Sequence, residues 1–121
     1  MTVKIDPALP VTVAVDFNSP QVAAYRLWHK NPGEIISTEL GTGTDQGPIA
    51  PPAYPFEVAG LEQDSQVSYH IKLFGNEAQP YSVTLTLAQK GVPLKDGIVP
   101  ERGNTDDDGF ADLTGKIKFS T

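Results

Sequence analysis

The sequence predicts an all-β domain, a two-sheet antiparallel β-sandwich of about seven or eight strands that occupies residues 1–121. Three observations predict this fold. Apolar and polar residues alternate in four separate segments, the pattern of strands with one buried face. Gly and Pro contribute eleven residues each, which favours many turns over long helices. A length of 121 residues is that of one domain with a modest core.

The four alternating segments are the clearest strands. In the first of them, Val11, Val13 and Val15 share one face while Thr12 and Ala14 share the other. The same period of two recurs in the other three. The four segments are Val11–Phe17, Val67–Leu73, Tyr81–Leu87 and Ala111–Phe119.

Weaker strand signals lie between these segments, and turn sequences separate them. Among the turns, Asp96-Gly97 and Asp108-Gly109 are dipeptides typical of tight hairpins. Short strands at this spacing are typical of immunoglobulin-like or jelly-roll sandwiches, and both topologies stay open. Trp28 is placed in the third strand, where a core Trp would pack. The weaker strands are Val3–Ile5, Val22–His29, Glu34–Leu40 and Phe56–Val58.

Composition excludes several classes of function. A formal charge of −6 argues against binding to nucleic acid, which requires clustered Lys and Arg. The absence of Cys excludes disulfides, thiolate metal sites and a catalytic thiol. No apolar run is long enough to cross a bilayer, and the first ten residues contain Lys4 and Asp6 but no apolar signal-peptide core. We expect a soluble protein with no membrane partner, and the sequence does not single out a compartment.

The segment Gly41–Pro55 departs from the strand pattern. It contains four prolines and predicts a long loop without strand character, and such loops are usually functional or disordered. Its prolines favour an extended conformation that is already ordered for recognition by a partner. Residues 51–54, with Tyr54 last, match the PPxY pattern that WW domains bind. The alternative is a rigid crossover between the sheets, in which Tyr54 covers an edge of the core.

The segment Asn104–Asp112 is the densest acidic cluster in the chain. Its alternating oxygen-bearing side chains and central Gly resemble the D-x-D-x-D-G-x-x-D calcium loops of thrombospondin-type and dockerin-like repeats. That resemblance implies a calcium site, since hard cations prefer many oxygen ligands. The implied ligands are Asn104, Asp106, Asp108 and Asp112.

The same segment also resembles two kinds of sandwich domain. Residues 105–111, with Thr105, Asp106 and Gly109, resemble the T-D-x-x-G hairpin of bacterial immunoglobulin-like and transthyretin-like domains. That resemblance implies a structural turn in which Asp bonds the backbone and Gly takes positive φ. The position of the acidic loop beside the last strand is similar to that of small calcium-dependent bacterial lectins.

The sequence gives little support for an enzyme. His29 and His70 are the only histidines, and both are interpreted as surface residues of strands. We therefore expect a non-catalytic binding module for carbohydrate or a partner protein, with Trp28 and Tyr54 as ligand-binding residues and Tyr25 as a further aromatic candidate. Core packing is the alternative role of Trp28 and Tyr25. The alternative function is a structural subunit of a homo-oligomer or a larger assembly.

Overall fold

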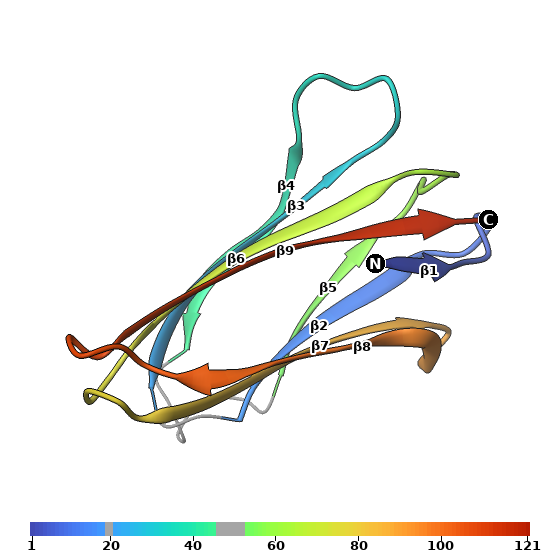
Figure 1. Cartoon of the computed structure of the whole chain (residues 1–121). Helices are drawn as coiled ribbons and strands as arrows, with labels where there is room; N and C mark the ends of the chain where they lie inside the picture. The colour runs from blue at the N-terminus through green and yellow to red at the C-terminus, as the bar shows by residue number, and fades with distance from the viewer. Residues whose placement is uncertain (19–20, 46–52) are drawn as a thin grey trace.

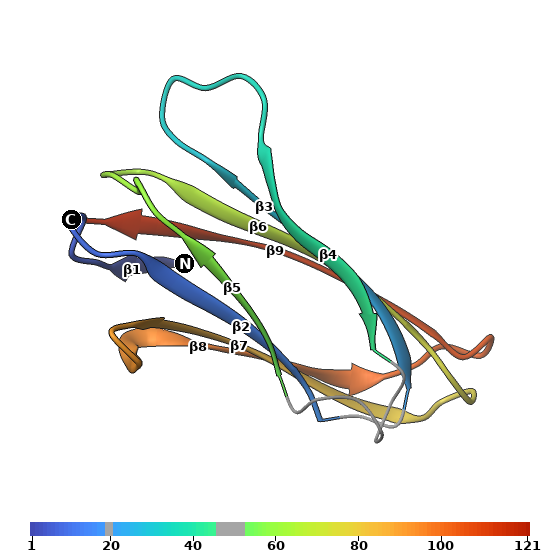
Figure 2. The same ribbon diagram turned by 180° about the vertical axis from the view of Figure 1, so that it is seen from behind.

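The computed structural model describes residues 1–18, 21–45 and 53–121, and in these the fold is all-β (Figure 1). Two sheets pack face to face, as Figures 1 and 2 show from opposite sides. The described residues form nine strands, more than the seven or eight predicted. They are β1 Thr2–Lys4, β2 Val11–Phe17, β3 Val22–Lys30, β4 Thr38–Asp45, β5 Tyr54–Val58, β6 Gln66–Phe74, β7 Pro80–Gln89, β8 Val92–Asn104 and β9 Phe110–Ser120.

One sheet has five strands in the order β1-β9-β6-β3-β4, and the other has four in the order β5-β2-β7-β8. The prediction of antiparallel sheets holds for every pair except β1 and β9, which run parallel. The described residues contain no helix long and apolar enough to cross a membrane.

The core lies between the two sheets and is built from the apolar half of each alternation. Val11, Val13 and Val15 of β2 are fully buried, as their spacing predicts. From the other sheet, Leu27 and Ile71 are equally buried. Because both inner faces contribute to one contact cluster, the described chain has a single core.

Strand β8 is the strand that the sequence pattern did not predict. It carries Pro93 and Pro100, lies at the edge of its sheet and exposes most of its residues, so it shows no alternation. The Asp96-Gly97 turn prediction is wrong, because these residues lie within β8 beside a shift in its register with β7. Residues 90 and 91 make the β7–β8 turn instead, both with positive φ.

Strands β4 and β5 correct the prediction of a structureless loop over Gly41–Pro55. Residues 41–45 complete β4 and Tyr54 begins β5, so the loop is shorter than predicted. Two positions of β4 are Gly because neighbouring aromatic rings leave no room for a side chain. A Cβ at Gly41 would lie 2.2 Å from the Phe56 ring, and a Cβ at Gly43 would lie 2.5 Å from the Tyr25 hydroxyl. Pro51 and Pro52 of the PPxY pattern lie outside the described residues.

Candidate functional site

The outward-facing residues of β4, β3, β6 and β9 form a surface that carries three hollows, and we call it the outer face. Strand alternation sends Tyr25 and Leu27 into the core, and it sends Arg26 and Trp28 outward. Pairing of β3 with β6 places Arg26 beside His70 and Trp28 beside Ser68. The outer face is therefore fixed by rigid strands rather than by loops.

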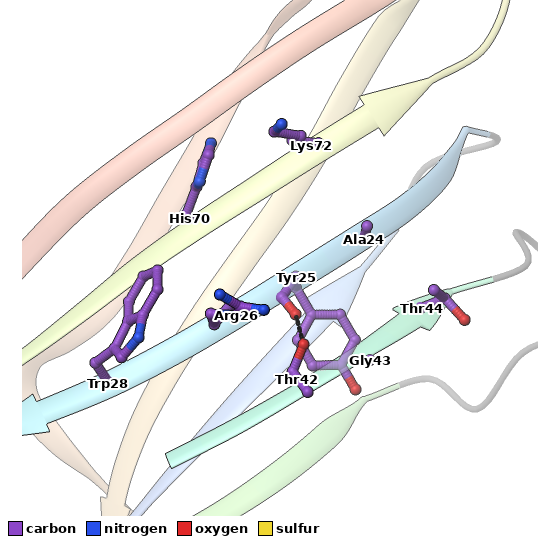
Figure 3. A pocket seen from close by; sticks show the side chains of 9 residues that line it. All are labelled: Ala24, Tyr25, Arg26, Trp28, Thr42, Gly43, Thr44, His70 and Lys72. Atoms are coloured by element: carbon purple, nitrogen blue, oxygen red, sulfur yellow. Dashed lines mark hydrogen bonds between the residues drawn. The ribbon is translucent and has the colours of Figure 1, made fainter. Parts of the chain in front are cut away.

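Trp28 lines two hollows of the outer face. One, of about 520 Å³, extends toward β4 and includes Arg26, Thr42 and Thr44 (Figure 3). The second, of about 460 Å³, extends toward β9 and includes Thr114 and Lys116. Core packing, the alternative role of Trp28, does not hold, because Trp28 lies on the same side of β3 as exposed Arg26 and not on the side of buried Tyr25.

Arg26 is held beside Trp28 by two contacts. Its guanidinium carbon lies 5.8 Å from the centroid of the Trp28 ring, within the range of a cation–π interaction. Its Nε lies 3.3 Å from Oε1 of Glu39 on β4. Both Arg26 and Glu39 are more than half exposed, so the ion pair orients the guanidinium and adds little stability.

His70 and Lys72 continue the outer face along β6. Figure 3 shows both side chains on the strand next to that of Trp28 and Arg26. Nε2 of His70 contacts Oδ1 of Asp112, which lies on the neighbouring strand β9. His70 is thus on the polar side of its strand, as predicted, with an acidic partner that single-strand patterns do not reveal.

A third hollow, of about 290 Å³, lies at the far end of the outer face. Lys72 lines it together with Phe74 and Phe110, whose rings meet edge to face at 5.2 Å. These two phenylalanines are 39% and 48% exposed, which is high for large apolar side chains. Lys72 also lines the first hollow, so neighbouring hollows adjoin at shared side chains, and we call the three together the groove.

Tyr54 and Tyr25 belong to an aromatic cluster between the sheets; Tyr25 also lines the first hollow from below (Figure 3), whereas Tyr54 lines none of the three hollows. Their ring centroids are 5.3 Å apart, and Phe17 lies within 6 Å of both. The Tyr54 hydroxyl donates a 2.8 Å hydrogen bond to buried Asp45. Burial raises the pKa of Tyr54 to about 12, and the bond to Asp45 adds to the shift. These contacts match the core-edge role of Tyr54 and place it apart from Trp28.

The acidic hairpin has the contacts that the turn interpretation predicts. Oδ1 of Asp106 accepts hydrogen bonds from the backbone of Asp108 and Phe110, both at 2.9 Å. Gly109 has a φ of 81° and bonds the Asp106 carbonyl. Among the described residues, no three His, Cys, Asp or Glu side chains form a group able to hold a metal ion. Asp112 lies against His70, and Asn104 ends β8.

Thr105 joins this hairpin to the β6–β7 loop. Its backbone and hydroxyl make three hydrogen bonds of 2.6–2.8 Å to Asn76 and Gln79, and the side chain is 3% exposed. A Cβ at Gly109 would lie 2.1 Å from the Gly75 carbonyl oxygen. The Thr and Gly of the T-D-x-x-G segment therefore hold two hairpins together.

Sequence reasoning missed most of the outer-face residues. Arg26, Lys72 and Phe110 come from three strands, and only the strand order brings them together. The sequence of β3 did contain a signal for the direction of Trp28. Arg26 and Trp28 are two residues apart in one strand, so both side chains point to the same face. The prediction that His29 is a surface residue is wrong, because it lies on the same side of β3 as buried Tyr25 and Leu27. Its Nδ1 is buried and has no hydrogen-bond partner among the described residues. No protein-family model, curated protein or solved structure matches the chain.

Proposed function

We propose that this protein is a non-catalytic carbohydrate-binding module that binds its ligand on the outer face. The observation that carries the proposal is the position of Trp28, a large aromatic ring that lines two hollows whose other outward side chains are mostly polar. Sugars present an apolar face of C–H groups edged by hydroxyls. A ring such as that of Trp28 can pack on the first while polar side chains bind the second.

The polar side chains around Trp28 suit hydroxyl groups. Arg26 supplies N–H donors, while Thr42 and Thr44 supply hydroxyls along β4. Lys is depleted at the centre of a typical protein-binding surface, whereas Lys72 and Lys116 line these hollows. This composition favours carbohydrate over a partner protein.

Binding to a glycan array followed by calorimetry tests the proposal. We expect the unmodified protein to bind at least one oligosaccharide on the array, and Trp28→Ala to weaken that binding at least about tenfold. Ile98→Ala is the matched control, since Ile98 is 55% exposed on the other sheet. Circular dichroism verifies that both variants fold. The proposal is contradicted if the protein binds no glycan of the array, or if Trp28→Ala binds as tightly as the unmodified protein.

A second candidate function is self-assembly through the β3–β4 loop. This loop, residues 31–37, projects beyond both sheets in Figures 1 and 2. Ile35 and Ile36 in it are 93% and 78% exposed. Asn31 anchors its base through hydrogen bonds with the Gly60 carbonyl and the Ser65 hydroxyl. A second copy of the chain would cover the two isoleucines in a symmetric contact.

Light scattering at increasing protein concentration tests assembly. A dimer that forms as concentration rises and is lost in Ile35→Ser/Ile36→Ser supports it. A strict monomer at the highest concentration excludes it. The paired substitution Val92→Ser/Ile98→Ser is the control, because it removes exposed apolar side chains from β8 instead.

The fold itself supports an immunoglobulin-like sandwich. The order β9-β6-β3-β4 follows the G-F-C-C′ order of variable-type immunoglobulin sheets. The chain departs from that plan in the β7–β8 hairpin, which comes between β6 and β9 in sequence and joins the opposite sheet.

A further inference from the structure

The distribution of charge narrows the ligand class beyond the proposed function. The strands of the five-stranded sheet direct six of the nine Lys and Arg residues outward, but only two of the fifteen acidic residues. The chain as a whole has a formal charge of −6. The outer face and the strand ends that continue it are therefore cationic on an acidic molecule. The six residues are Lys4, Arg26, Lys30, Lys72, Lys116 and Lys118.

Most of these cations have no ion-pair partner among the described residues. Arg26 pairs with Glu39, and Lys118 lies 3.5 Å from Asp64. Lys72 and Lys116 line the groove and make no salt bridge within the described chain. Both ammonium groups are thus available to a ligand, with Asp112, the cross-strand neighbour of Lys72, as the nearest acidic residue along the strands.

The groove is also long. Trp28 pairs with Ser68, and Phe74 is six residues further along the same strand, which corresponds to about 20 Å. Lys72 lies between these positions and is shared by two of the hollows. Aromatic rings therefore lie at both ends of this track, with Arg26 and Lys72 between them.

We infer that the ligand of the outer face is an extended acidic polysaccharide, a chain of sugars carrying carboxylate or sulfate groups. This inference rests on the proposed function. Trp28 at one end and the Phe74–Phe110 pair at the other pack against sugar rings. Lys72, between these ends, and Lys116, level with Trp28 on β9, bind the anionic groups. A single sugar occupies too little of the track to contact both aromatic ends.

An acidic glycan suits this face better than a nucleic acid. A nucleic acid carries a phosphate on every nucleotide, and binding it requires Lys and Arg clustered without acidic side chains between them. Glu39 and Asp112 are interspersed among the cations, which matches a ligand with spaced anionic groups and hydroxyls between them.

Calorimetry with length-matched oligosaccharides tests the inference on the full chain. The probes are neutral cello-oligosaccharides, carboxylated oligogalacturonides and sulfated heparin fragments, each from disaccharide to octasaccharide. We expect one acidic series to bind at least about tenfold tighter than the neutral series. That affinity falls as salt rises from about 50 to about 500 mM, because ions screen exposed charges.

Two pairs of variants localise the effect. We expect Lys72→Gln and Lys116→Gln each to weaken acidic-glycan binding about two- to fivefold. The control substitutions are Lys90→Gln in the β7–β8 turn and Lys95→Gln in β8, and we expect both to leave binding unchanged. Phe74→Ala weakens binding of the octasaccharide and spares that of the disaccharide.

The outcomes separate this inference from the proposed function. Equal, salt-independent binding of neutral and acidic chains that Trp28→Ala abolishes overturns the inference and leaves the module a carbohydrate binder. Failure to bind any glycan overturns both. Tighter binding of a poly-dT oligonucleotide than of every glycan also overturns both, and it identifies a nucleic-acid face.

Discussion

Tyr69 of β6 lies directly across from Gly115 of β9, and its ring occupies the space that a side chain at Gly115 would need. A Cβ at Gly115 would lie 2.3 Å from the ring. The same pairing of a Tyr with a cross-strand Gly recurs at Tyr25 with Gly43 and at Tyr81 with Gly103. In these three pairs, a glycine that would weaken its strand is covered by the ring of the Tyr opposite.

We predict that Gly115→Ala lowers the free energy of unfolding by about 1 to 3 kcal/mol, because the new methyl group overlaps the Tyr69 ring. Urea denaturation measures the change. In a Tyr69→Leu background the same substitution costs less, since the ring is gone. An equal cost in both backgrounds would show that the clash is not with Tyr69.

Stability should fall at high pH because of Tyr69. Burial, assisted by the hydrogen bond that its hydroxyl donates to Glu101, raises the pKa of Tyr69 to about 12 from the ordinary 10. The folded state holds this proton more tightly than the unfolded chain does. Its contribution is therefore complete below pH 10 and is lost as pH rises toward 12, amounting to about 2 to 3 kcal/mol.

Urea denaturation across pH 9 to about 12 checks this slope. Tyr69→Phe cannot ionise at this position, so its stability declines less steeply in that window. Tyr54→Phe is a second probe, because the pKa of Tyr54 is raised to about 12 in the same way. Identical slopes for the unmodified protein and Tyr69→Phe would contradict the prediction.

Thr105→Val should destabilise the fold by about 1 to 3 kcal/mol. The substitution keeps the shape of the side chain but leaves the Asn76 carbonyl and the Gln79 amide without their hydroxyl partner. Thr105→Ser keeps the hydroxyl and is the matched control, with a smaller loss. Thermal unfolding ranks the two variants, and a Val variant as stable as the Ser variant would refute the role of the hydroxyl.

Calcium should leave the melting temperature unchanged. Asp106 already bonds two backbone amides, and Asp112 contacts His70, so these carboxylates serve the turn and the outer face. Thermal melts with millimolar calcium and with chelator measure the effect. A midpoint that rises with calcium and falls back in Asp108→Asn would instead support the calcium site predicted from sequence.

Much of the fold could be predicted because, in a strand with one buried face, every second residue is apolar. The bounds of β2, Val11–Phe17, are those predicted from its alternation. The pattern failed where burial is not alternating. Strand β8 is an exposed edge interrupted by Pro93 and Pro100, and β4 replaces core side chains with Gly41 and Gly43.

The candidate site was predicted only in part, at Trp28. The face to which Trp28 points could be predicted from Arg26, two residues earlier in the same strand. The residues that surround Trp28 depend on the order of the strands, which the sequence does not show. Lys72 and Phe110 are 38 residues apart in sequence and meet because β6 pairs with β9. No local pattern specifies such a pairing, because both strands present polar and apolar residues in the same alternation.

The parallel pairing of β1 with β9 has a kinetic consequence. Residues 2–4 pair with residues 118–120, so these two strands cannot dock until residue 120 has been synthesised. Contacts between such distant residues carry a large loop-closure entropy, and all-β domains rich in them fold in about milliseconds to seconds. During synthesis, β1 therefore has no strand partner until β9 has been made, and β9 also carries Lys116 and Lys118 of the outer face.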